Sequence, residues 1–139
     1  MHTLSITTKF YLHLSLIFIL IQGVSAQNHQ VIDSLSQVLE SDISDKKRVD
    51  TYNSIAQEYS YTDSLATSKY VNQAIELAEQ ISYSEGKIDA LYTIAWSIAV
   101  KGYPADAEMR YKRIIQKADS MGYTSGKARA YDRMGVCAI

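Results

Sequence analysis

Residues that could carry out acid–base, nucleophilic or metal chemistry are few and widely separated in this chain. After residue 26 there is one histidine, His29, and one cysteine, Cys137, at opposite ends. A zinc site of the His/Cys kind needs three or four ligands, and a serine–histidine pair could use only His29. Glu76 and Glu79 lie in a polar helical segment, so we interpret them as ion-paired and solvated. We expect no enzyme activity, no metal and no cofactor.

The stretch GYTSGK at residues 122–127 is a candidate phosphate-binding loop, because glycine-rich turns before helices can hold anions on free N–H groups. A P-loop has four residues between its glycines, whereas three separate Gly122 from Gly126. Ala128 stands where the magnesium-binding hydroxyl belongs, and the preceding segment is predicted to be a helix rather than a strand. We therefore interpret the stretch as a turn between two helices.

The apolar residues before and after that turn follow the spacing of amphipathic helices. Four of them recur at intervals of three and four residues in one segment, namely Leu91, Ile94, Ala95 and Ile98. Gly102 ends this segment, and Pro104 suits the first turn of the next helix, where its missing N–H is not needed. Gly122 suits the end of the second helix, where the backbone often adopts the left-handed conformation that glycine favours. Residues 87–126 are therefore predicted to form a helix, a short turn and a second helix.

This unit occurs more than once. The link SYSEGK at residues 82–87 returns as GYTSGK at 122–127, with tyrosine, glycine and lysine in the same places. Apolar positions in residues 49–59 match those in 88–98, and positions in 71–81 match those in 111–121. A period near forty residues in helix pairs is typical of solenoids, in which no unit buries its apolar face alone. We predict an all-α fold of about two and a half stacked repeats, at 46–85, 86–125 and 126–139.

The first 26 residues have the layout of a secretory signal peptide. Lys9 precedes an apolar run at residues 10–21, and Val24, Ser25 and Ala26 supply small residues for cleavage after Ala26. The alternative is an uncleaved membrane anchor, although a span needs roughly twenty apolar residues. We expect an exported chain, periplasmic or otherwise extracytoplasmic. With a single cysteine it can form no internal disulfide, and we interpret Cys137 as a core residue.

Residues 27–45 are predicted to form a short capping helix and a turn that cover the first repeat.

Charged residues are distributed unevenly after residue 26. Residues 27–100 hold five Lys/Arg and eleven Asp/Glu, whereas residues 101–139 hold eight Lys/Arg and four Asp/Glu. The basic second half could meet an anionic partner, or it could be the solvated face of helices, which is the interpretation we prefer. Export argues against nucleic acid as a partner.

The second copy resembles a tetratricopeptide repeat (TPR). Its pattern is Leu91, Ile94-Ala95, Ile98, Gly102-Tyr103, Ala107 and Tyr111, at the positions where that family places its large, small, turn and aromatic residues. The match departs at Ile114, where the family prefers alanine, and in the first copy at Asp63 and Thr67. The resemblance spans residues 46–139. It implies a right-handed α-solenoid that binds a protein or peptide.

In that family the leading helices of the stacked pairs line a concave groove. The resemblance therefore implies a partner-binding groove formed by Asn53, Gln57, Tyr92, Thr93, Trp96, Arg129 and Arg133. Tyr92 and Trp96 are four residues apart and share one side of a helix, although Trp96 could equally pack between repeats. Arg129 and Arg133 are similar to the basic pair of the family's carboxylate clamp. The clamp's asparagine is replaced here by Tyr92 or Thr93, so we do not predict a clamp.

A narrower similarity concerns the arrangement of the whole chain. A signal peptide, an Ile-Asp-Ser-Leu helix at residues 32–35 and the Gly-Tyr-x-x-Gly-Lys link look like the extracytoplasmic sensor regions of Bacteroidetes signalling proteins. This similarity implies a fragment of a signal-transduction protein, with its membrane span and output domain further downstream. The alternative is a stand-alone secreted scaffold that forms a homo-oligomer through an exposed C-terminal helix, with Met134 and Ile139 at the contact.

Overall fold

The computed structural model of this protein describes residues 29–137, and its side chains as far as Gly135. The predicted signal peptide and Ile139 therefore lie outside the described residues. The chain divides into two compact units, Met1–Ser34 and Leu35–Ile139, and only residues 29–34 of the first are described. In the described part of the chain, no helix is both long and apolar enough to cross a membrane.

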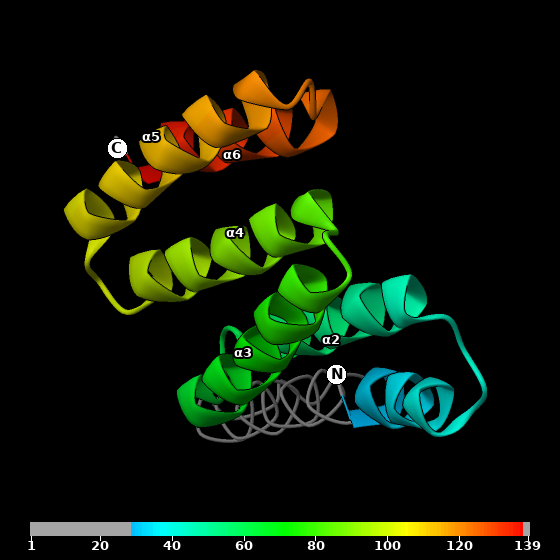
Figure 1. The fold of residues 1–139 in the computed structure, drawn as a ribbon. Helices are drawn as coiled ribbons and strands as arrows, with labels where there is room; N and C mark the ends of the chain where they lie inside the picture. The colour runs from blue at the N-terminus through cyan, green and yellow to red at the C-terminus, as the bar shows by residue number, and fades with distance from the viewer. Residues whose placement is uncertain (1–28, 138–139) are drawn as a thin grey trace, which may run out of the picture. The chain divides into compact units, whose positions relative to one another are not determined.

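The described residues are all-α, as predicted, and contain no strand. Residues 29–40 are helical, and five further helices follow (Figure 1), namely α2 (Asp45–Tyr59), α3 (Ser64–Gln80), α4 (Ser84–Val100), α5 (Pro104–Ser120) and α6 (Thr124–Cys137). Each of these five helices packs against the next, and α4 also contacts α2 and α6. No contact joins α3 to α5. The helix, turn and helix predicted for residues 87–126 are α4 and α5, with α4 beginning three residues earlier, at Ser84.

Polar side chains begin α2 and α3, and a proline begins α5, as predicted for Pro104. The Ser44 hydroxyl accepts a hydrogen bond from the Lys47 N–H (3.3 Å), which caps α2. The Asp63 carboxylate accepts from two N–H groups at the start of α3, each at 2.9 Å. Pro104 is the first residue of α5. These contacts satisfy donors that the first helical turn leaves unpaired.

Three helices end in the same left-handed turn. Ser82, Gly102 and Gly122 have φ values of 56°, 89° and 69°, and a tyrosine follows each of them. The N–H of that tyrosine donates to a carbonyl five residues back, as from Tyr83 to Ala78 at 2.7 Å and from Tyr123 to Ala118 at 2.8 Å. This is the Schellman arrangement, in which the residue at positive φ is usually glycine.

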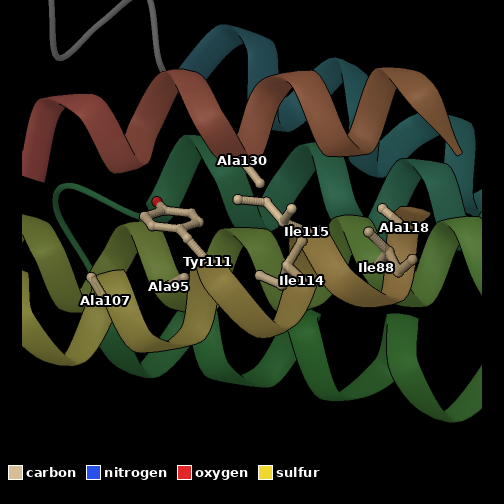
Figure 2. Packing of buried hydrophobic residues seen from close by; sticks show 8 residues of the cluster. All are labelled: Ile88, Ala95, Ala107, Tyr111, Ile114, Ile115, Ala118 and Ala130. Carbon is tan, nitrogen blue, oxygen red and sulfur yellow. The ribbon is translucent and has the colours of Figure 1, made fainter. Parts of the chain in front are cut away.

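The core consists of two apolar clusters. One lies between α2, α3 and α4 and is rich in alanine, with Val49, Ala56, Val71, Ala74, Ala78 and Ala90. The other lies between α4, α5 and α6 (Figure 2), with Ile88, Ala95, Ala107, Tyr111, Ile114, Ile115, Ala118 and Ala130. Several positions matched between the two copies are buried in both, such as Val49 and Ile88, Ala56 and Ala95, and Ala78 and Ala118. Val71 and its counterpart Tyr111 are each 0% exposed.

The link between consecutive helix pairs builds the same contact twice, which we call the tyrosine joint. In the first joint, the Tyr83 hydroxyl donates to Asp50 Oδ1 on α2 at 3.0 Å. In the second, the Tyr123 hydroxyl donates to both carboxylate oxygens of Asp89 on α4 at 3.1 Å. Each tyrosine thus ties the start of one leading helix to the leading helix before it.

Glycine in each link lets the tyrosine ring close over the helix. A Cβ atom at Gly86 would come within 2.6 Å of the Tyr83 ring and of Val49 Cγ1. At Gly126 it would overlap the Tyr123 ring in the same way. Both glycines are buried. Since such separations lie far inside van der Waals contact, no larger residue fits without moving the joint.

We predict opposite effects for two alanine substitutions in helices. Gly86→Ala should lower the free energy of unfolding by about 1–2 kcal/mol, because overpacking costs more than the roughly 1 kcal/mol that alanine gains in a helix. Gly135→Ala, whose Cβ would meet nothing within 4 Å, should stabilise by up to about 1 kcal/mol. Urea unfolding followed by circular dichroism measures both. Equal effects would mean that no close approach exists at Gly86.

The joint hydroxyls should contribute measurably to stability. Tyr83→Phe removes the donor to a carboxylate, and hydrogen bonds to charged groups are the stronger kind, so we expect a loss of about 1–2 kcal/mol. Tyr103→Phe is the matched control, because its side chain is 61% exposed and follows the same type of turn. It should change stability by less than about 0.5 kcal/mol. The same urea titration compares the two, and equal losses would refute the joint.

Candidate functional site

Four of the seven predicted groove residues come together on α4 and α6, and we call Tyr92, Trp96, Arg129 and Arg133 the aromatic–arginine face. The Arg129 guanidinium lies 5.2 Å from the centre of the Tyr92 ring. The Arg133 guanidinium lies 4.2 Å from the Trp96 ring, and its Nε donates to the Tyr92 hydroxyl at 3.1 Å. Arginine over an aromatic ring is held by cation–π attraction and stacking. All four side chains remain partly exposed.

The other three predicted groove residues lie elsewhere. Asn53 is 4% exposed, and its Nδ2 donates to the Gly86 carbonyl at 2.8 Å. Thr93 is 1% exposed, and its hydroxyl donates to the Asp89 carbonyl of its own helix at 3.2 Å. These two side chains are therefore out of reach of a partner in this structure. Gln57 is exposed on α2.

Two residues that the sequence analysis did not select belong to this face. The Asp89 carboxylate accepts from Arg129 Nη2 as well as from Tyr123, so the second tyrosine joint also orients an arginine of the face. The Tyr61 ring packs edge-on to Trp96 at 5.6 Å between centres. A signal for Asp89 was present, since Asp50 and Asp89 occupy equivalent positions of the two copies. No sequence signal marks Tyr61, which sits in the turn after α2.

The charges of the face are fixed by their neighbours. The hydrogen bond to Tyr92 raises the pKa of Arg133, so this guanidinium stays charged. Burial raises the pKa of Asp89, while the Arg129 charge and the Tyr123 hydrogen bond act in the opposite direction. The Arg129 side chain is half-buried over Tyr92 and against Asp89. The face thus presents two cations, each of which lies over one aromatic ring.

The described residues contain no group of three His, Cys, Asp or Glu side chains that could hold a metal ion. Glu79 pairs with Lys87, and both side chains are largely solvated. Residues 122–126 form the turn between α5 and α6 and the first residues of α6, which confirms their interpretation as a turn between helices. His29 is exposed at the start of the described chain.

The C-terminal helix differs from expectation in which apolar side chain it exposes. Met134 packs against the cluster between α4, α5 and α6 instead of lying free on the surface. Among the described side chains of α6, Tyr131 is an exposed large hydrophobic one, at 50%.

No protein-family model, no curated protein and no solved structure matches this chain.

The tyrosine joints should make the fold sensitive to alkaline pH. Burial raises the pKa of Tyr83 and of Tyr123 above the ordinary value of 10.0. The folded chain therefore holds more protons than the unfolded chain above about pH 10, and the free energy of unfolding must fall as pH rises there. The double variant Tyr83→Phe/Tyr123→Phe lacks both groups, so its stability should fall less steeply. Urea unfolding between about pH 8 and 11 tests this, and parallel curves would contradict it.

Proposed function

We propose that this chain is a non-enzymatic binding module of the tetratricopeptide type, built as a right-handed solenoid of helix pairs that engages a peptide or protein. This proposal is supported first by the pattern of contacts between helices. The leading helices α2, α4 and α6 contact one another in turn, while α3 and α5 each contact only the leading helices beside them. Repeated tyrosine joints and repeated buried positions also fit stacked units.

The observation that carries the proposed binding role is the aromatic–arginine face. Tyrosine, tryptophan and arginine are the residue types that dominate binding energy at protein interfaces. Here they lie on adjacent leading helices, half-exposed, and held in place by one another. A guanidinium has five N–H donors, and the contact to Tyr92 uses the Nε edge of Arg133. The two terminal Nη groups of Arg133 are suited to donate to a carboxylate or to a backbone carbonyl of an extended peptide.

The resemblance to extracytoplasmic sensor regions supports a more specific role for such binding. In this proposal the chain is exported, its N-terminal 26 residues direct it across the cytoplasmic membrane, and the module senses its ligand for a signal-transduction protein. The exposed Tyr131 on α6 favours a second candidate, a secreted scaffold that self-associates through this helix. Sedimentation of the chain and of Tyr131→Asp at several concentrations separates the two. A dimer abolished by the substitution supports the scaffold.

The binding role is tested with peptides selected from a random display library against the purified chain. Trp96 is the only tryptophan, so its fluorescence should change when a selected peptide binds. Trp96→Ala/Arg133→Ala should weaken binding of the labelled peptide at least about tenfold, because hot-spot residues each contribute about 2 kcal/mol or more. Helicity should stay unchanged, since both side chains lie at the surface.

A matched control removes an apolar and a cationic side chain from another helix. Leu65→Ala/Lys69→Ala alters exposed residues of α3, and should leave the affinity unchanged. Loss of helicity in the Trp96/Arg133 variant would show that these residues serve the core. A peptide that binds both double variants with the affinity of the original chain would refute the face as the binding site.

A further inference from the structure

A recess of about 470 Å³ lies between α4 and α5. Its floor is apolar and is formed by Ile88 and Leu91 of α4 and Ile114 of α5. Ile88 and Ile114 are core residues, 2% and 4% exposed, so the floor is rigidly packed. The volume falls within the roughly 300–1,000 Å³ of pockets that hold small molecules or single anchoring side chains.

The rim of this recess is formed by cations, namely Lys87, Arg110, Arg113 and Lys117, and its lining includes no carboxylate. Lys87 pairs with Glu79, which lies outside the recess. Within residues 29–135, the other three cations form no ion pair. Three of the four cations therefore have no carboxylate of the described residues at ion-pair distance.

The three uncommitted cations are also close to one another. Arg110, Arg113 and Lys117 are three and four residues apart on α5, so they lie along one side of that helix. Like charges at these spacings repel, which makes the arrangement unfavourable without a counter-charge. An anionic group over this side of α5 would remove that repulsion.

A second recess of about 530 Å³ continues along the same helices. It shares Arg110 and Arg113 with the first, and adds apolar surface from Ile98, Tyr103 and Met109. Tyr103 and Met109 are 61% and 56% exposed. Its lining holds one carboxylate, Asp106, which lies four residues before Arg110 on α5. The two recesses together form a groove in which apolar surface and cations alternate.

We propose that this α4–α5 groove binds an acidic peptide segment that carries aliphatic side chains. Carboxylates would pair with Arg110, Arg113 and Lys117, and an aliphatic side chain would occupy the floor over Ile88 and Ile114. A small inorganic anion would leave the apolar floor uncovered, and a flat bilayer would not enter a recess. None of the residues of the aromatic–arginine face lines this groove, so the site goes beyond the binding function proposed above and can exist without it.

The test uses a fluorescent peptide of alternating glutamate and leucine, the same peptide with glutamine for glutamate, and one with alanine for leucine. Anisotropy titrations of the whole chain should show binding of the first peptide, weakened by salt, and much weaker binding of the other two. Arg113→Gln/Lys117→Gln should reduce its affinity about tenfold, because charge-assisted contacts are lost. Lys69→Gln/Lys112→Gln is the control, since it removes two solvated lysines and the same net charge.

Each outcome decides the proposal. A loss confined to the Arg113/Lys117 variant supports the groove, and Trp96→Ala/Arg133→Ala should then bind this peptide normally. Equal losses in both glutamine variants would mean that the peptide responds only to net charge. Binding abolished by the Trp96/Arg133 variant alone would assign the peptide to the aromatic–arginine face. Binding of anionic lipid vesicles that competes with the peptide and depends on the same two cations would overturn the peptide as occupant.

Discussion

The tyrosine joint is the contact on which the arrangement of the helices depends. In each link one tyrosine, Tyr83 or Tyr123, donates its backbone N–H to a carbonyl at the end of the helix before it. Its ring packs over a glycine, and its hydroxyl donates to an aspartate on the preceding leading helix. These contacts join each helix pair to the one before it. Small residues such as Ala90 and Ala130 are packed in the same interfaces, and each is 0% exposed.

The second joint connects this packing to the candidate site. Because Asp89 accepts from both Tyr123 and Arg129, the residue that aligns α6 with α4 also holds a cation over Tyr92. Arg133, one turn later, then reaches Trp96. By contrast, Arg110, Arg113 and Lys117 of α5 form no ion pair among the described residues, whereas Lys112 of the same helix pairs with Glu108 at 2.7 Å. The excess of basic residues in the second half of the chain is thus divided between stacked arginines on one helix and these three cations on another.

Helix positions, caps and the link turns could be predicted from the sequence because each rests on local chemistry, as at Ser44, Asp63 and Pro104. The groove could be predicted only in part. Periodicity shows which residues share a helix side, but the rotation of that side toward a neighbour depends on packing. Asn53 and Thr93 are therefore buried where exposure was expected, and Met134 is packed inward. Comparing polar positions between copies would have identified Asp50 and Asp89.

The central claim is that α4 and α6 present a preformed surface for a peptide. Its most direct test is the NMR spectrum of the isotopically labelled chain titrated with a peptide selected from a random library without reference to any site. Trp96 supplies the single indole N–H signal of the chain, and the arginine side-chain signals report on Arg129 and Arg133. The account predicts that these signals shift together at saturation. Shifts confined to α2 and α3, with the Trp96 signal unmoved, would contradict it.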